Sequence, residues 1–289
     1  MDDSPLSTNK IAILLMISAI FCFSIMDAFV KVISPEMGIL NALWARYSGQ
    51  MIVVLILVAP RLRSVAKTQF LGLQIARSFL LLGATFFLFL GLARIGLAQA
   101  TAVMVMNPVF ITLGGAIFLG ETLGYRRLSA IAVAFVGAML IIRPGTQTFD
   151  PAALFPLIGA LSYSGYALIT RQVGPREDPW TSLFYTALVG GVLMTLLAPF
   201  YWVWPDPTHA VGMLGIAGIG TLGQLLLIKA FSQASAGTLA PFGYSGLLFA
   251  TLIGITAFQE FPDLLTTLGA LVIVLSGIYV WRRETTQTI

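Results

Sequence analysis

Long apolar stretches separated by short polar connections recur along the whole chain. Each runs for roughly 20 residues, and an α-helix of that length, rising about 1.5 Å per residue, crosses a hydrocarbon core of about 30 Å. The pattern therefore predicts an all-α membrane protein with ten transmembrane helices. The predicted spans are Ile11–Ile33, Ile39–Ala59, Leu71–Ala93, Gln99–Leu119, Leu128–Ile142, Ala152–Thr170, Trp180–Val203, Ala210–Ile228, Gly237–Phe258 and Asp263–Trp281.

The composition supports this interpretation. Of the 289 residues, 58% are hydrophobic and 10% are charged, and the mean hydropathy is +0.93. A water-soluble domain of this size has a more polar composition, so most of the chain must face lipid or other buried helices. We expect the first span to stay in the membrane, because it is too long for a signal peptide. The single cysteine, Cys22, excludes an internal disulfide, and we expect it to be a packing residue.

The basic residues fall mostly on one side of the predicted membrane. If the spans alternate in direction, Lys31, Arg94 and Arg143 lie on the side opposite the termini. By the positive-inside rule both termini are then cytoplasmic, in what we expect to be a bacterial inner membrane. The basic pI therefore reflects topology, and we expect no nucleic-acid partner. The basic residues on the side of the termini are Lys10, Arg61, Arg63, Lys67, Arg126, Arg127, Arg171, Arg176, Lys229, Arg282 and Arg283.

The chain resembles itself at a shift of about 140 residues. Phe110–Leu113, for example, aligns with Phe249–Leu252. If residues 1–145 and 146–289 each hold five spans, the odd number makes the second half enter the membrane from the other side. Such inverted repeats are typical of secondary transporters, in which the two halves enclose a midplane site and rock to alternate its access.

The segment MDAFVK places an acid and a base inside the first span. Lys31 lies about one turn from the end of that span, and we expect its amine to snorkel to the interface. Asp27 lies deeper, and Arg46 of the second span lies at nearly the same depth across a short connection. Asp27 is therefore expected to pair with Arg46, as well as or instead of with Lys31. Such a pair either only holds two helices together or forms part of a binding site or gate.

Other polar side chains lie within predicted spans. Arg77 lies about one and a half turns inside the third span, where it either snorkels to the headgroups or recognises an anionic group of a solute. Uncharged glutamines add possible contacts to a solute or hydrogen bonds between helices. These glutamines are Gln50, Gln74, Gln99 and Gln224, of which Gln50 and Gln224 are candidate site residues.

Helix breakers interrupt two spans. Asn107 and Pro108 lie in the middle of the fourth span, where proline removes a backbone hydrogen bond and frees a carbonyl for a ligand, ion or water. Pro241 lies in the ninth span beside two glycines. Interruptions at corresponding places in two halves indicate a binding site, with both prolines as hinges. A kink that only improves packing is the alternative.

Aromatic residues fall into two groups. Tyr163, Tyr166 and Tyr244 lie deeper than an interfacial belt, as do Trp44 and Tyr47. They either wall a cavity through stacking and hydroxyl contacts or pack the core. Tryptophans at predicted span ends are expected to anchor the protein at the interface. These are Trp180, Trp202, Trp204 and Trp281.

Several of these stretches together resemble the drug/metabolite transporter superfamily, EamA type. The matching segments are ARYSG in the second span, ARS in the third, ATAVMVMNPVFITLGGAIFLGE across the fourth and RPG after the fifth. Leu119–Glu121 is the most specific match, whereas Gln259 and Glu260 depart from the expected Gly-Glu. The resemblance implies cytoplasmic termini and a central cavity for amino acids, nucleosides, vitamins or other small metabolites. The first half is also similar to members that carry S-adenosylmethionine or riboflavin.

Together these features predict a secondary-active carrier of a small metabolite that works by alternating access. A passive channel or facilitator and a non-transporting scaffold are the alternatives. We expect no enzyme and no cofactor or metal, because the one histidine lies in a predicted loop and neither an HExxH motif nor a nucleotide-binding loop occurs. Coupling to protons or a counter-solute and formation of a homodimer stay open. Pairing with arginine is expected to keep Asp27 ionised, which argues against Asp27 as the proton carrier.

Overall fold

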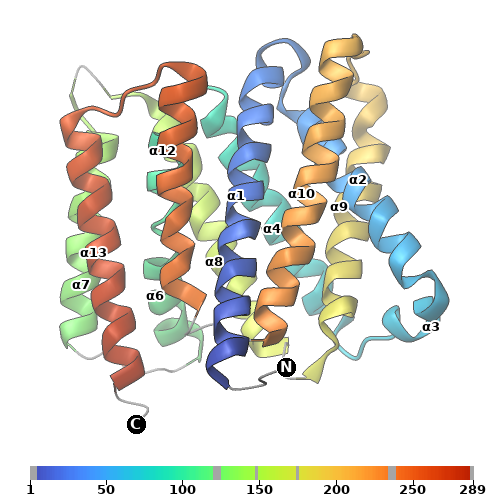
Figure 1. The fold of residues 1–289 in the computed structure, drawn as a ribbon, viewed down its shortest axis with the longest axis horizontal. Helices are drawn as coiled ribbons and strands as arrows, with labels where there is room; N and C mark the ends of the chain where they lie inside the picture. The colour runs from blue at the N-terminus through green and yellow to red at the C-terminus, as the bar shows by residue number, and fades with distance from the viewer. Residues whose placement is uncertain (1–4, 120–124, 147–148, 174–175, 234–238, 287–289) are drawn as a thin grey trace.

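The helices lie side by side and run alternately up and down the bundle (Figure 1). The computed structural model describes residues 5–119, 125–146, 149–173, 176–233 and 239–286, and within these ranges it has no strand. Both chain ends lie at one end of the bundle, the lower one in Figure 1, which we call the terminal end. The other end, where α1 (Pro5–Met37) and α7 (Tyr125–Ile142) finish, is called the distal end.

The prediction of helical spans from hydropathy is confirmed. Among the described residues, seven helices are long and apolar enough to cross a membrane, and three shorter apolar segments, Leu128–Ile142, Phe242–Phe258 and Leu264–Tyr279, bring the number to the predicted ten. Besides α1 and α7, the elements are α2 (Ile39–Val58), η1 (Ala59–Arg61), α3 (Leu62–Val65), α4 (Leu71–Leu92), α5 (Leu97–Met104), α6 (Asn107–Leu119), η2 (Pro151–Ala153), α8 (Leu154–Val173), α9 (Pro179–Tyr201), α10 (Pro207–Gln233), η4 (Ala240–Tyr244), α12 (Ser245–Phe258) and α13 (Leu264–Thr286).

The two spans with helix breakers are interrupted. In the fourth span α5 ends at Met104 and α6 begins at Asn107, because Pro108 has no N–H to continue the hydrogen-bond ladder. In the ninth span the 3-10 helix η4 contains Pro241 and precedes α12. The carbonyl of Asn107 accepts a hydrogen bond from the Ser164 hydroxyl at 3.0 Å, so a side chain of α8 occupies this carbonyl.

Small residues set the closest helix contacts. α1 packs on α10, α4 on α8, α2 on α9 and α7 on α13. A Cβ added at Gly223 of α10 would lie 3.0 Å from the Phe23 ring of α1. Between α7 and α13, Gly137 and Gly269 face each other, and a Cβ at Gly269 would lie 2.5 Å from the Gly137 carbonyl oxygen. Glycines thus let backbones meet directly where lipid provides no hydrophobic force between helices.

Replacing Gly269 with alanine is therefore expected to destabilise the protein by about 1–3 kcal/mol, because the new methyl group forces α7 and α13 apart. Thermal unfolding in detergent measures the effect. The matched control is Gly72→Ala at an exposed position near the start of α4, where nothing lies within 4 Å of the added Cβ. The control should leave the melting temperature unchanged or raise it, since alanine favours helix. Equal effects of the two substitutions would contradict the close packing.

Candidate functional site

Arg46 lies near the middle of α2, and its guanidinium contacts a sulfur atom and two aromatic rings. Its Nη1 donates to Met26 Sδ at 3.3 Å. The guanidinium carbon lies 5.8 Å from the centroid of the Phe23 ring and 5.7 Å from that of Tyr47, within the range of cation–π attraction. No residue in the described ranges gives this guanidinium an oxygen acceptor. Arginine carries five N–H donors, so most of the donor capacity of Arg46 is unused.

Asp27 of α1 interacts with Arg46 only through space. Its Oδ1 is buried and has no hydrogen-bond partner among the described residues, although Arg46 acts on the carboxylate electrostatically. The predicted direct ion pair is therefore not formed, because the Arg46 guanidinium turns to the Met26 sulfur and the two rings. Without the direct pair, the reason to expect Asp27 to stay ionised no longer holds. Asp27 and Arg46 are a neighbouring acidic and basic side chain, each with unfilled hydrogen-bonding capacity among the described residues.

Tyr47 connects this pair of charges to α4 and α8. Its hydroxyl shares a hydrogen bond of 3.0 Å with Thr85 of α4, and Tyr166 of α8 lies near it. The Tyr166 ring lies 5.6 Å, between centroids, from the ring of Tyr163. Two of the inner tyrosines predicted from the sequence therefore lie together on α8, and Tyr166 lies near Tyr47 of α2.

Arg77 is buried, with 3% of its surface exposed, and binds three neutral oxygens. Its Nε donates to Thr170 Oγ1 at 3.0 Å, its Nη1 to Gln74 Oε1 at 2.9 Å and its Nη2 to the Tyr166 hydroxyl at 3.2 Å. Snorkelling to the headgroups is therefore the wrong interpretation of Arg77. α8 packs closely on α4 and offers two of these oxygens, those of Thr170 and Tyr166, so the guanidinium stays inside the bundle.

Gln74 extends this network to the terminal end. Its Nε2 donates to Glu177 Oε2 at 3.1 Å and to Ser182 Oγ at 3.2 Å. Glu177 precedes α9 and also accepts from the backbone N–H of Gln69 at 3.4 Å. We call the set Gln74, Arg77, Thr170, Glu177 and Ser182 the terminal cluster. It joins α4 to α8 and α9.

Lys31 does not pair with Asp27. Its Nζ lies 2.7 Å from Glu260 Oε1 and donates to the Ile95 carbonyl at 2.9 Å, at the distal end of the bundle. The reason is that Glu260, in the connection after α12, meets the end of α1. Sequence reasoning missed this partner, although Glu260 stands where the internal repeat places Glu121. Gly120 and Glu121 lie outside the described residues.

The remaining candidates are dispersed. Gln50 is buried and Gln224 half-buried, and the structure gives neither a hydrogen bond within the described ranges. Asn107 is half-buried at the start of α6, where Pro108 follows. The hydroxyl of Tyr244 packs where a side chain at Gly277 of α13 would lie.

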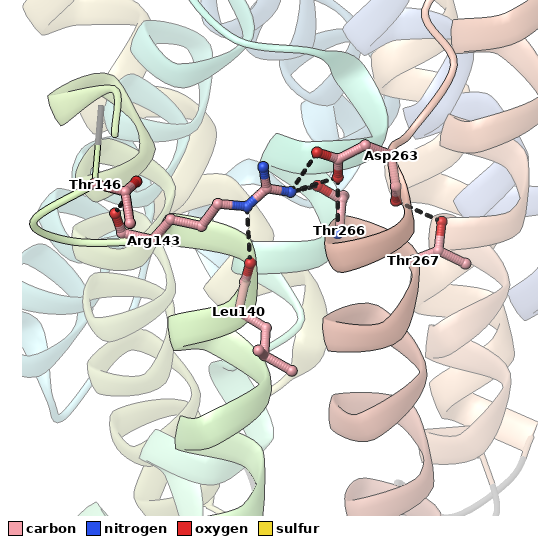
Figure 2. A network of polar contacts seen from close by, with 6 residues as sticks. All are labelled: Leu140, Arg143, Thr146, Asp263, Thr266 and Thr267. Carbon is pink, nitrogen blue, oxygen red and sulfur yellow. Dashed lines mark hydrogen bonds and ion pairs between the residues drawn. The ribbon is translucent and has the colours of Figure 1, made fainter. Parts of the chain in front are cut away.

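A second distal ion pair joins α7 to α13 (Figure 2). Arg143 follows α7 with a left-handed φ of 54°, and its Nη2 donates to both carboxylate oxygens of Asp263. Asp263 also caps α13 by accepting from the Thr266 N–H at 2.9 Å. A cation at a helix C-terminus and an anion at a helix N-terminus suit both helix dipoles. This peripheral pair was not predicted from the sequence.

The hydrogen bond from Arg143 lowers the pKa of Asp263 from 3.8 to about 2. Because the folded-state pKa lies below the unfolded one, the pair stabilises the fold above about pH 4 and loses this effect as the pH falls towards 2. Asp263→Asn is expected to lower stability at pH 7 by up to about 1 kcal/mol, since the pair is partly exposed. Melting curves of both proteins should converge at low pH. Asp150→Asn, which removes another helix cap for which the described residues show no basic partner, is the control that measures the loss of a cap alone.

Comparison with known proteins finds a family match for each half of the chain and several relatives that match nearly its whole length. Residues 10–143 and 150–282 each match the EamA-like transporter family. The S-adenosylmethionine uptake transporter of Rickettsia bellii is 27% identical over 279 residues, which cover 96% of each chain. The pseudopaline exporter of Pseudomonas aeruginosa is 30% identical over 95% of this chain and 97% of its own. The riboflavin transporter of Vibrio cholerae is 28% identical over 94% of this chain and 93% of its own.

The helical bundle also has a counterpart among solved structures. One crystal structure aligns over 94% of this chain and 98% of its own, with a TM-score of 0.64 and 19% identity, which indicates a shared fold. The apolar helices make the protein an integral membrane protein. Since the family matches cover nearly all of those helices, the chain belongs to the EamA-like transporter family of the drug/metabolite transporter superfamily.

Proposed function

We propose that this protein is a secondary-active carrier that moves a small metabolite by alternating access to a site between two inverted halves, residues 1–145 and 146–289. Two separate family matches, at residues 10–143 and 150–282, support this division. Relatives named as transporters of S-adenosylmethionine, riboflavin or pseudopaline support a small-molecule substrate.

The packing of helices supports the inverted repeat. Numbered as spans, α1 on α10 is the first on the eighth, and α4 on α8 is the third on the sixth. When the two halves are exchanged, each span number rises or falls by five. This exchange converts each of these pairs into the other. The pairs α2 with α9 and α7 with α13 map onto themselves. The interruptions lie in the fourth and ninth spans, which also exchange, so one two-fold relation accounts for every major contact.

The observation that carries the binding site is the unfilled bonding capacity of Asp27 and Arg46. Ionisable groups inside a membrane are costly and are retained where they serve a function. Asp27 Oδ1 has no partner, and Arg46 has only a sulfur acceptor among the described residues. A solute that offers an oxygen acceptor, such as a carboxylate, to Arg46 and an N–H or O–H donor to Asp27 completes both. Tyr163 and Tyr166 form one wall, and Gln50, Asn107, Gln224 and Tyr244 are further candidate contacts.

The carrier lies in a bacterial cytoplasmic membrane with both termini inside. Lys31, Arg94 and Arg143 are the basic residues that we assign to the outer side, and the distal end is then the external one. Pro108 and Pro241, each in an interrupted span, act as the hinges.

Counterflow in proteoliposomes tests the proposal. Vesicles are loaded with unlabelled solute and given labelled amino acids, nucleosides, S-adenosylmethionine or flavins in turn. A carrier accumulates the label transiently and saturates, whereas a passive channel equilibrates it without overshoot. Absence of exchange for every class, with protein shown to be folded, would count against a carrier of these metabolites.

A further inference from the structure

Four chain segments meet at one ion pair at the distal end. Lys31 of α1 pairs with Glu260, which follows α12, at 2.7 Å. The second carboxylate oxygen of Glu260 accepts from the N–H of Leu97, the first residue of α5, at 2.9 Å. Lys31 donates to the carbonyl of Ile95, just after α4, at 2.9 Å. We call Lys31, Ile95, Leu97 and Glu260 the distal latch.

The backbone is shaped to bring the carboxylate to this place. Gln259 has a left-handed φ of 56°, and the N–H of Glu260 donates to the Gly254 carbonyl at 2.9 Å, which ends α12 in a tight turn. The carboxylate lies against Gly96, where an added Cβ would be in ordinary van der Waals contact, 3.4 Å from Glu260 Oε2. The carboxylate faces the N-terminus of α5 and the ammonium faces the last carbonyls of α4, so both helix dipoles favour the closed arrangement.

The latch has the properties of a contact that opens at modest cost. The side chain of Lys31 is 15% exposed and that of Glu260 is 31% exposed. Both lie at the end of the bundle, so each charge gains hydration when the two separate. A pair buried at the membrane centre would lack this compensation. The two arrangements, paired and hydrated, therefore differ little in free energy, as a gate requires.

The latch joins the two proposed halves, and so does the terminal cluster at the other end. Lys31, Ile95 and Leu97 belong to residues 1–145, whereas Glu260 belongs to residues 146–289. At the terminal end, Gln74 binds Glu177 and Ser182 across the same division. In this structure each end therefore has polar contacts that join the two proposed halves. Access to a central site from the distal end requires the distal latch to break while the terminal cluster holds.

We propose that the Lys31–Glu260 pair is the distal gate of the carrier and that it breaks and re-forms once in each transport cycle. This inference rests on the proposed carrier function. It predicts that loss of either charge leaves the distal end open, with the fold otherwise intact.

Cysteine labelling tests the gate without any substrate. Ser24 is buried and lies two turns below Lys31 on the same face of α1. Ser24→Cys is introduced into a Cys22→Ala background, and a membrane-impermeant maleimide is added on the distal side. Labelling should be slow with the latch intact and should accelerate on the order of tenfold with Lys31→Met or Glu260→Gln, since loss of the pair shifts the closed–open equilibrium. Lys31→Arg, which keeps the charge, should restore slow labelling.

Matched controls separate gating from unfolding. Asp263→Asn breaks a different distal pair, between α7 and α13, and should leave labelling slow. Melting temperatures of all variants are measured in parallel. Glu260→Gln should disturb the fold less than Lys31→Met, because its amide oxygen still accepts the hydrogen bond from the Leu97 N–H. Unchanged labelling in both Lys31→Met and Glu260→Gln would overturn the gate, even where the wild type exchanges a solute. Faster labelling in a protein that exchanges no solute would support the gate and count against the carrier function alone.

Discussion

Replacing Arg46 with glutamine is expected to reduce counterflow about 30-fold or more while the protein still folds. Truncation of one partner of a buried charge contact costs about 2–5 kcal/mol of binding, and each 1.4 kcal/mol is tenfold. The folded protein without solute loses much less, because Arg46 contacts only the Met26 sulfur and two aromatic rings. Initial counterflow rates and melting temperatures, measured on the same preparations, separate the two effects.

The matched control for this substitution is Arg94→Gln at the distal end. Arg94 is exposed, so its replacement removes the same charge without touching the interior. It should leave both the counterflow rate and the melting temperature near wild type. If Arg46→Gln instead transports normally and only melts earlier, Arg46 has a structural role and the proposed binding site is wrong.

The spans were predictable because membrane insertion is a local property of the sequence. Ile39–Ala59 was predicted and α2 covers Ile39–Val58; Leu71–Ala93 was predicted and α4 covers Leu71–Leu92. The interruption at Asn107 and Pro108 was also predictable, since a missing N–H acts within one turn. Hydropathy sufficed for the spans, and the position of proline sufficed for the interruption.

Partners of the charged side chains were not predictable in the same way. Depth in the membrane was the only ground for pairing Asp27 with Arg46 on the neighbouring helix. Lys31 instead meets Glu260, which is 229 positions away along the chain, and Arg77 meets Thr170 and Tyr166 of α8. These contacts depend on which helices pack together. Packing between the halves is set by glycine contacts such as that of Gly223 with Phe23, which hydropathy does not register.

Replacing Arg77 with methionine is expected to destabilise the protein by about 2–4 kcal/mol, because buried acceptors are left without donors. Gln74 Oε1 and the Tyr166 hydroxyl each accept from Arg77 and would each lose that bond. Thr170 is less affected, since its hydroxyl still donates to the Tyr166 carbonyl at 2.7 Å. Methionine has a similar length, so packing between α4 and α8 is largely kept. Thermal or denaturant unfolding in detergent measures the loss.

Two further variants locate the cause of that loss. Arg63→Met removes a charge from an exposed position near the same end of the bundle and should leave stability unchanged. Arg77→Lys keeps the charge but replaces a planar fork by a single ammonium group, which does not reach three oxygens in fixed directions. It should therefore melt between wild type and Arg77→Met. If Arg77→Lys matched the wild type, charge alone would explain the effect, and the fork geometry that joins α4 to α8 would be irrelevant to stability.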